Sequence, residues 1–183
     1  MLKKSLVLTS LTFSLLFFGC SDSTQEEESM VAKTSFELTS TQSQKFTITK
    51  EGNEFSLTPK SSKIIIYDIF ATWCPPCRAE APHLASLQKK FPDDLLVLGI
   101  TIEDDKTNAD LEAFKKEYGA NYTILNSKDN KALASAMASV VGEGPRFGIP
   151  LMIMMKDGKY ITHYSGMVPE EMIESDFKKA LEQ

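Results

Sequence analysis

The chain has 183 residues, of which 42% are hydrophobic and 25% charged, and its net charge at pH 7 is −5. These values are those of an ordinary globular protein that is large enough to bury a core without disulfide or metal staples. An acidic chain without a basic cluster excludes nucleic acid as a partner.

The first 19 residues have the composition of an export signal. A short basic head, Met1–Lys4, precedes an apolar stretch, Leu6–Phe18, that is shorter than the about 20 residues of a transmembrane helix. Cys20 follows Gly19 and resembles the cysteine that bacterial lipoproteins attach to lipid. We therefore expect residues 1–19 to be a lipoprotein signal peptide, with a plain cleaved signal or an uncleaved short anchor as alternatives. Each of these places the domain in an extracytoplasmic (periplasmic) location, and a lipidated Cys20 would hold it at the membrane.

The segment after the signal divides into a tether and a folded domain. Residues 20–35 are polar and acidic without apolar periodicity, which predicts a flexible tether. The folded domain is expected over residues 36–183. It opens with three stretches that alternate apolar and polar residues and predict short strands in an N-terminal β-hairpin extension: Phe36–Leu38, Phe46–Ile48 and Phe55–Leu57.

A continuous apolar run, Ile64–Phe70, predicts a strand that is covered on both faces. Strand and helix patterns alternate after it: a helix over 78–91, a strand over 95–102, a helix from Thr107 or Asn108 to Tyr118, a strand over 122–125, a helix over 131–141, a strand–turn–strand over 151–164 and a last helix from about Pro169. This order predicts an α/β domain with a central mixed sheet flanked by helices.

Two cysteines, Cys74 and Cys77, lie between the apolar run and the first of these helices. A helix N-terminus carries about half a positive charge and free N–H groups, so it stabilises a thiolate there. A second thiol three residues further on lies on the same side of the first turn and can close a disulfide. The pair therefore predicts a site of thiol–disulfide exchange.

Two other interpretations of the cysteine pair are less favourable. A structural zinc site needs four ligands, and the remaining candidates are only Cys20, His83 and His163. A structural disulfide over so short a loop removes little entropy from the unfolded chain. We expect no metal and no cofactor.

Several motifs resemble the thioredoxin superfamily, and in particular its membrane-anchored TlpA/ResA/CcmG-type thiol–disulfide oxidoreductases. They are Tyr67–Pro82 (YDIFATWCPPCRAEAP), Gly148-Ile149-Pro150, Lys156-Asp157-Gly158-Lys159 and Gly166. The resemblance runs from about Phe36 to the end of the chain. It implies a thioredoxin fold in which the strand and helix within Asn121–Val141 are a central insertion.

The resemblance also implies roles for individual residues. Cys74 would be the exposed attacking cysteine and Cys77 the buried resolving cysteine. Ile149 and Pro150 would form a cis peptide bond that lies against the dithiol and binds the substrate backbone. Trp73 would face the substrate, pack against the domain, or do both.

Two carboxylates complete the predicted site. Asp68 lies in the apolar strand six residues before Cys74, where burial would raise its pKa and let it accept the proton of Cys77. Glu80 shares a helix face with Cys77 and matches the active-site glutamate of the ResA-like branch. The alternatives are an aspartate that points to water at a strand edge and a solvated helix glutamate.

We interpret the sequence as a monomeric, lipid-anchored oxidoreductase that reduces protein disulfides. The resemblance implies apocytochrome c as a client and a membrane thiol transporter as the electron donor. Because Pro75 and Pro76 lack N–H groups, Cys77 supplies the nearest donor to Cys74, and moderate stabilisation of the thiolate favours a reductant. A disulfide oxidase or isomerase, and a metal- or haem-delivery chaperone that uses the same dithiol, are the alternatives.

Overall fold

The structure is a computed structural model that describes residues 33–182. The predicted signal peptide, Cys20 and the tether as far as residue 32 lie outside these residues. Among the helices within 33–182, none combines the length and apolar character that a membrane span requires.

The strands and helices of the described chain follow the predicted order. They are β1 (Lys33–Thr39), β2 (Lys45–Glu51), β3 (Glu54–Thr58), β4 (Ile64–Phe70), α1 (Pro75–Lys90), β5 (Leu95–Thr101), α2 (Asn108–Tyr118), β6 (Thr123–Leu125), α3 (Asn130–Val140), β7 (Leu151–Lys156), β8 (Lys159–Ser165) and α4 (Glu170–Leu181). The strands form a three-stranded sheet, β1-β2-β3, and a five-stranded sheet, β6-β5-β4-β7-β8.

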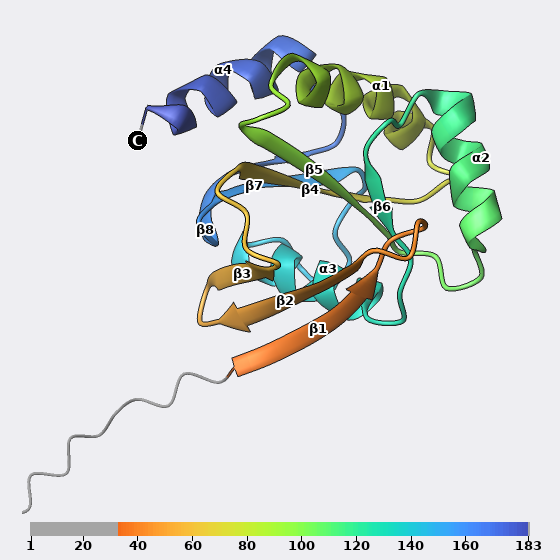
Figure 1. The fold of residues 1–183 in the computed structure, drawn as a ribbon, viewed down its shortest axis with the longest axis horizontal. Coiled ribbons are helices and arrows are strands. Elements are labelled where there is room, and N and C mark those ends of the chain that lie inside the picture. The colour runs from red at the N-terminus through yellow and green to blue at the C-terminus, as the bar shows by residue number, and fades with distance from the viewer. Residues whose placement is uncertain (1–32, 183) are drawn as a thin grey trace, which may run out of the picture. The chain divides into compact units, whose positions relative to one another are not determined.

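The five-stranded sheet is mixed, as predicted. β4, β5 and β6 are parallel, whereas β7 and β8 run antiparallel to their neighbours. Helices α1 and α4 lie on one face of this sheet, and α3 and the three-stranded sheet lie on the other (Figure 1). All seven residues of β4 are buried, which confirms the prediction of a strand covered on both faces.

The alternation of side chains along β4 assigns its residues to two cores. The odd-numbered positions pack toward α3 and the three-stranded sheet. The apolar even-numbered positions pack into the core that also contains Cys74, Cys77 and residues of α1, α2 and α4. Asp68 is an even-numbered position, so the register of β4 directs its carboxyl group to the side of the cysteines.

The N-terminal extension contains the three predicted strands. β1, β2 and β3 form an antiparallel meander, and β1 already begins at Lys33, within the segment expected to be tether. The Phe55 N–H donates to the Gly158 carbonyl at 2.8 Å, and the Asn126 N–H donates to the Thr39 carbonyl at 2.8 Å. These bonds join the meander to the five-stranded sheet. A Cβ at residue 158, where φ is +81°, would lie 3.0 Å from the Phe55 oxygen, so this turn requires glycine.

The ends of α2 follow the signals in the sequence. Thr107 and Asp110 form a reciprocal capping box, and Gly119 ends the helix in the left-handed conformation. β6 and α3 form the predicted strand–helix insertion. The side chain of Asn130 at the start of α3 donates to the carbonyl of Leu125 at 2.8 Å, which fixes the helix to β6.

Candidate active site

The dithiol lies where β4 passes into α1. Cys74 is the N-cap residue of α1 and is disulfide-bonded to Cys77, with a Cα–Cα distance of 5.3 Å. Pro75 and Pro76 occupy the first two helical positions and have no N–H group. Cys74 Sγ therefore caps the helix by accepting the N–H of Cys77 at 3.4 Å, which is the donor that the sequence predicted.

The expectation that Cys74 is exposed is wrong for this disulfide form. Cys74 and Cys77 are each only 3% exposed. The reason is the loop before β7, in which the carbonyl oxygen of Ile149 lies 3.6 Å from Cys74 Sγ. The sulfurs thus lie at the edge of the core and not on an open surface.

The residues expected to bind substrate surround this position. The Ile149–Pro150 peptide bond is cis, as the resemblance implied. The N–H of Gly166 donates to the Pro150 carbonyl at 2.8 Å, so β8 fixes the proline segment. Trp73 is 61% exposed beside Cys74, which leaves its ring free to contact a partner. Contact of these three residues with substrate stays a prediction.

Asp68 is buried, so the alternative of an aspartate pointing to water is wrong. The Tyr122 hydroxyl donates to Asp68 Oδ2 at 2.8 Å, and Asp68 Oδ1 has no hydrogen-bond partner within residues 33–182. Burial raises the pKa of Asp68 to about 7, and the Tyr122 hydrogen bond opposes part of this rise. The carboxyl group thus has one fixed oxygen and one that is available for a proton.

Glu80 is also buried, so the alternative of a solvated helix residue is wrong as well. Its Oε2 accepts the N–H of Val168 at 3.2 Å. Burial raises the pKa of Glu80 to about 7; the Val168 N–H opposes this rise, and the charges of Asp68 and Glu170 add to it. Asp68 and Glu80 therefore interact electrostatically.

Sequence reasoning missed two residues that shape the site, Tyr122 and Glu103. The Glu103 carboxylate accepts hydrogen bonds from both the N–H and the hydroxyl of Thr72, the latter at 3.0 Å. Arg78 donates to the Thr72 carbonyl at 2.7 Å, so the loop that carries Trp73 is held from two sides. The contacts of Tyr122 and Glu103 join distant parts of the chain, and no local motif signals them.

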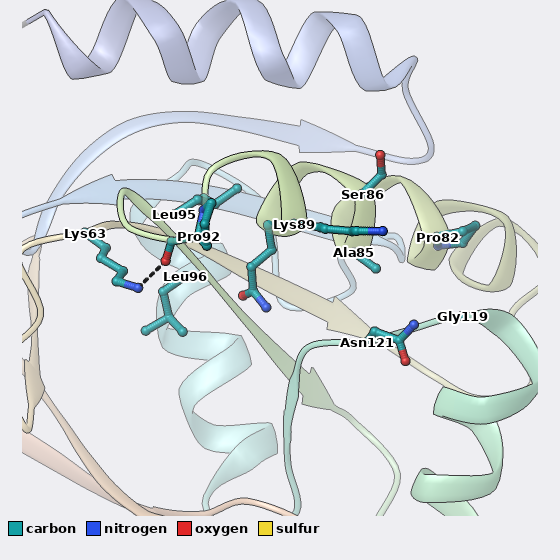
Figure 2. Close-up of a pocket in the computed structure, with 11 residues that line it drawn as sticks. Lys63, Pro82, Ala85, Ser86, Lys89, Pro92, Leu95, Leu96, Gly119 and Asn121 are labelled. Carbon is teal, nitrogen blue, oxygen red and sulfur yellow. Dashed lines mark hydrogen bonds between the residues drawn. The ribbon is translucent and has the colours of Figure 1, made fainter.

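The dithiol does not open into the pocket beside α1. That pocket has a volume of about 720 Å³, and Pro82, Ala85, Gly119 and Asn121 are among the residues that line it (Figure 2). None of the predicted site residues lines it. Nor does the described part of the chain group three or more histidine, cysteine or acidic side chains as a metal-binding set.

The fold and the dithiol together define a thioredoxin-like thiol–disulfide oxidoreductase whose redox-active pair is Cys74 and Cys77. Residues 35–181 match the Redoxin family model, and the chain belongs to the Redoxin family.

Individual relatives agree with this assignment. The chain is 26% identical over 130 residues to the thiol-disulfide oxidoreductase ResA of Bacillus thuringiensis (strain Al Hakam), and the match covers 70% of each protein. The crystal structure of StoA from Bacillus subtilis shares the fold with a TM-score of 0.57 and 16% identity, over 80% of this chain and 98% of StoA. The pneumococcal exposed lipoprotein thioredoxin Etrx1 from Streptococcus pneumoniae strain TIGR4 gives a TM-score of 0.56 and 18% identity, over 80% of this chain and 99% of Etrx1.

Proposed function

We propose that this oxidoreductase reduces disulfides of extracytoplasmic proteins while a lipidated Cys20 holds it at a membrane. The observation that carries the proposal is the Cys74–Cys77 disulfide at the start of α1, with the Ile149 carbonyl 3.6 Å from Cys74 Sγ. A substrate backbone that pairs with the segment around cis-Pro150 would pass directly over this sulfur.

The reaction begins from the reduced dithiol. The Cys74 thiolate attacks one sulfur of the substrate disulfide, so that a Cys74–substrate bond forms, the substrate S–S bond breaks and one substrate thiolate leaves. Cys77 then loses its proton and attacks Cys74 Sγ, which releases the second substrate thiolate and forms the Cys74–Cys77 disulfide. The substrate gains the two electrons that the dithiol loses.

Asp68 and Glu80 are the proposed proton acceptors for Cys77. A group accepts and returns protons most effectively when its pKa lies near the working pH. Burial brings the pKa values of both carboxyl groups to about 7, and each has one oxygen without a hydrogen-bond partner within residues 33–182. Both properties support this role.

The cap of α1 supports the proposed direction of the reaction. One N–H group, that of Cys77, reaches Cys74 Sγ, because the two prolines before it have none. A thiolate with few donors is only moderately stabilised, and a dithiol of this kind holds its electrons less tightly than that of a strong oxidant. This supports a reductant.

We further propose apocytochrome c as the client and a membrane thiol transporter as the source of electrons. The match to the thiol-disulfide oxidoreductase ResA over 70% of the chain supports a protein that exchanges disulfides with other proteins. The pneumococcal relative is described as an exposed lipoprotein thioredoxin, which supports the lipid anchor. In the mature chain Cys20 and the polar residues after it would tether the domain, which would act as a monomer.

The deciding experiment measures the reduction potential of the Cys74–Cys77 pair in the purified protein. The protein is equilibrated in glutathione or dithiothreitol buffers, and its free thiols are alkylated and counted by mass spectrometry. A potential near or below about −270 mV, together with reduction of insulin, supports a reductant. A potential near about −120 mV, which is typical of a strong periplasmic oxidant, overturns the proposal.

A further inference from the structure

Tyr122 reaches the predicted proton acceptor across a neighbouring strand. Tyr122 directly precedes β6, whereas Asp68 lies in β4, and β5 lies between these two strands in the sheet. The residue of β5 directly opposite Asp68 is Gly99. A Cβ at residue 99 would lie only 3.1 Å from Cε2 of the Tyr122 ring. The ring therefore crosses β5 where that strand has no side chain.

The surroundings of the ring leave it little freedom. A Cβ added at Gly99 would also lie 3.2 Å from the Ile124 side chain and 3.2 Å from the Phe70 side chain. Apolar groups therefore surround the place where the Tyr122 ring crosses β5. Tyr122 is 4% exposed, and its hydroxyl group lies 2.8 Å from Asp68 Oδ2. A buried hydroxyl needs a partner, and here that partner is one particular carboxylate oxygen.

The raised pKa of Tyr122 keeps its hydroxyl group protonated, so that it can always donate a hydrogen bond. Burial, followed by the nearby charges of Asp68 and Glu80, raises the pKa of Tyr122 well above its ordinary value. The phenol therefore keeps its proton at neutral pH and donates it to Asp68 in a hydrogen bond. It cannot take up the proton of Cys77 itself, because its own oxygen is already protonated.

We propose that Tyr122 is a positioning residue for disulfide exchange, which holds Asp68 Oδ2 so that Oδ1 receives the Cys77 proton, and that Gly99 is the opening through which it acts. This inference rests on the proposed role of Asp68 as proton acceptor. In the step concerned the proton leaves Cys77 Sγ and binds Asp68 Oδ1, and Tyr122 keeps its own proton. No electrons move until the Cys77 thiolate attacks Cys74.

The other ionisable groups around Asp68 are few. Glu80 is buried on α1 three residues after Cys77, and the charge of Asp68 acts on it. Glu170 acts on Glu80 from the start of α4, and His83 Nδ1 lies 3.9 Å from Glu80 Oε1. A measurement on Asp68 must therefore follow Glu80 in the same titration.

The test compares Tyr122→Phe with Tyr164→Phe. Both changes remove a tyrosine hydroxyl that donates to a carboxylate, but the partner of Tyr164 is Asp176, at 2.9 Å. The carboxyl ¹³C shifts of Asp68 and Glu80 are followed against pH in the reduced full-length protein. A second measurement follows release of a model peptide from its mixed disulfide with Cys74 over the same pH range.

We expect the pKa of Asp68 to rise by about one pH unit in Tyr122→Phe, because its charged form loses a charge-assisted hydrogen bond. The inflection of the release rate should move up by the same amount, and at pH 7 the rate should fall about five-fold. Tyr164→Phe should leave both values at those of the wild type. An unchanged Asp68 pKa in a folded Tyr122→Phe variant overturns the inference.

A tyrosine analogue of nearly the same shape but greater acidity should change the pKa of Asp68 in the opposite direction. Difluorotyrosine incorporated at position 122 donates a stronger hydrogen bond, so the pKa of Asp68 should fall below the wild-type value. If Tyr122→Phe does not fold, this variant decides alone, and the absence of a fall refutes the inference. These titrations use no substrate. Failure of the wild type to reduce insulin would therefore refute the proposed function and leave the Tyr122 inference open to its own test.

Discussion

The carbonyl oxygen of Ile149 lies 3.6 Å from Sγ of Cys74, although 75 positions separate the two residues. The contact brings the loop before β7 against the N-cap residue of α1 and accounts for the burial of the sulfur that attacks the substrate in the proposed reaction. We therefore propose that a protein substrate approaches along the Ile149–Pro150 segment and pairs its backbone with this loop.

The two cysteines should respond differently to substitution. Cys77→Ser removes the thiol that displaces the substrate, so the protein should accumulate as a mixed disulfide through Cys74. Cys74→Ser removes the attacking thiol, and insulin reduction should fall to the rate of the uncatalysed control. Non-reducing electrophoresis and mass spectrometry of each variant after incubation with substrate distinguish the outcomes. A mixed disulfide in Cys74→Ser but none in Cys77→Ser would reverse the assigned roles.

Asp68→Asn should stabilise the domain at neutral and higher pH. The pKa of Asp68 is about 7 in the folded protein and ordinarily about 3.8, so the folded state holds a proton that the unfolded chain has released between these pH values. Stability from this group is complete below about pH 4 and is lost as the pH rises through about 7. Asparagine has no charge to bury and can still accept the Tyr122 hydrogen bond. We expect Asp68→Asn to raise the free energy of unfolding by roughly 2–4 kcal/mol at pH 8 and to change it little at pH 4.

Asp176→Asn is the matched control for this measurement. Lys179 and Tyr164 lower the pKa of Asp176, so neutralising it should destabilise the domain at neutral pH. Urea denaturation at pH 4 and pH 8 measures both variants. If Asp68→Asn at pH 8 is no more stable than the wild type, burial of the Asp68 charge is not the dominant effect.

Trp73→Ala should weaken the interaction with protein substrates without weakening the fold. The ring is 61% exposed, so its removal should change the free energy of unfolding by no more than about 0.5 kcal/mol. The KM for insulin should rise several-fold. Tyr160→Ala, which removes an exposed aromatic side chain of β8, is the control and should leave KM unchanged. Equal KM values for the Trp73→Ala variant and the wild type would remove Trp73 from the substrate site.

Cys20→Ala tests the proposed lipid anchor in cells. No helix within residues 33–182 could span a membrane, so if the proposed acyl chain is the anchor, the protein should move from the membrane fraction to the soluble fraction. Cys74→Ala should stay with the membrane. A Cys20→Ala protein that remains in the membrane fraction would identify residues 1–19 as an uncleaved anchor.

The sequence predicts the parts of the structure that depend on local patterns. The apolar run of β4, the start of α2 near Thr107 and its end at Tyr118 each depend on a few neighbouring residues, and the structure contains all three. The cis bond before Pro150 was predictable only from its motif, because most proline peptide bonds are trans.

Contacts between distant strands were not predictable in the same way. The Tyr122–Asp68 hydrogen bond joins residues 54 positions apart, and the Glu103–Thr72 pair joins residues 31 apart. Both depend on the register of β5 against its neighbours, which the apolar pattern of a fully buried strand does not specify. The burial of Cys74 likewise depends on the loop before β7.

The position of β1 also determines how the domain responds to tension. A pulling force applied through the N-terminal chain enters at Lys33, whose partner in the antiparallel ladder is Glu51. The hydrogen bonds at that end of the three-stranded sheet carry the load first. The redox disulfide follows β4, in the other sheet, and the two sheets are joined by bonds such as that between Asn126 and Thr39. With the proposed lipid anchor at Cys20, tension along the N-terminal chain would act on β1 before it reached the sulfurs.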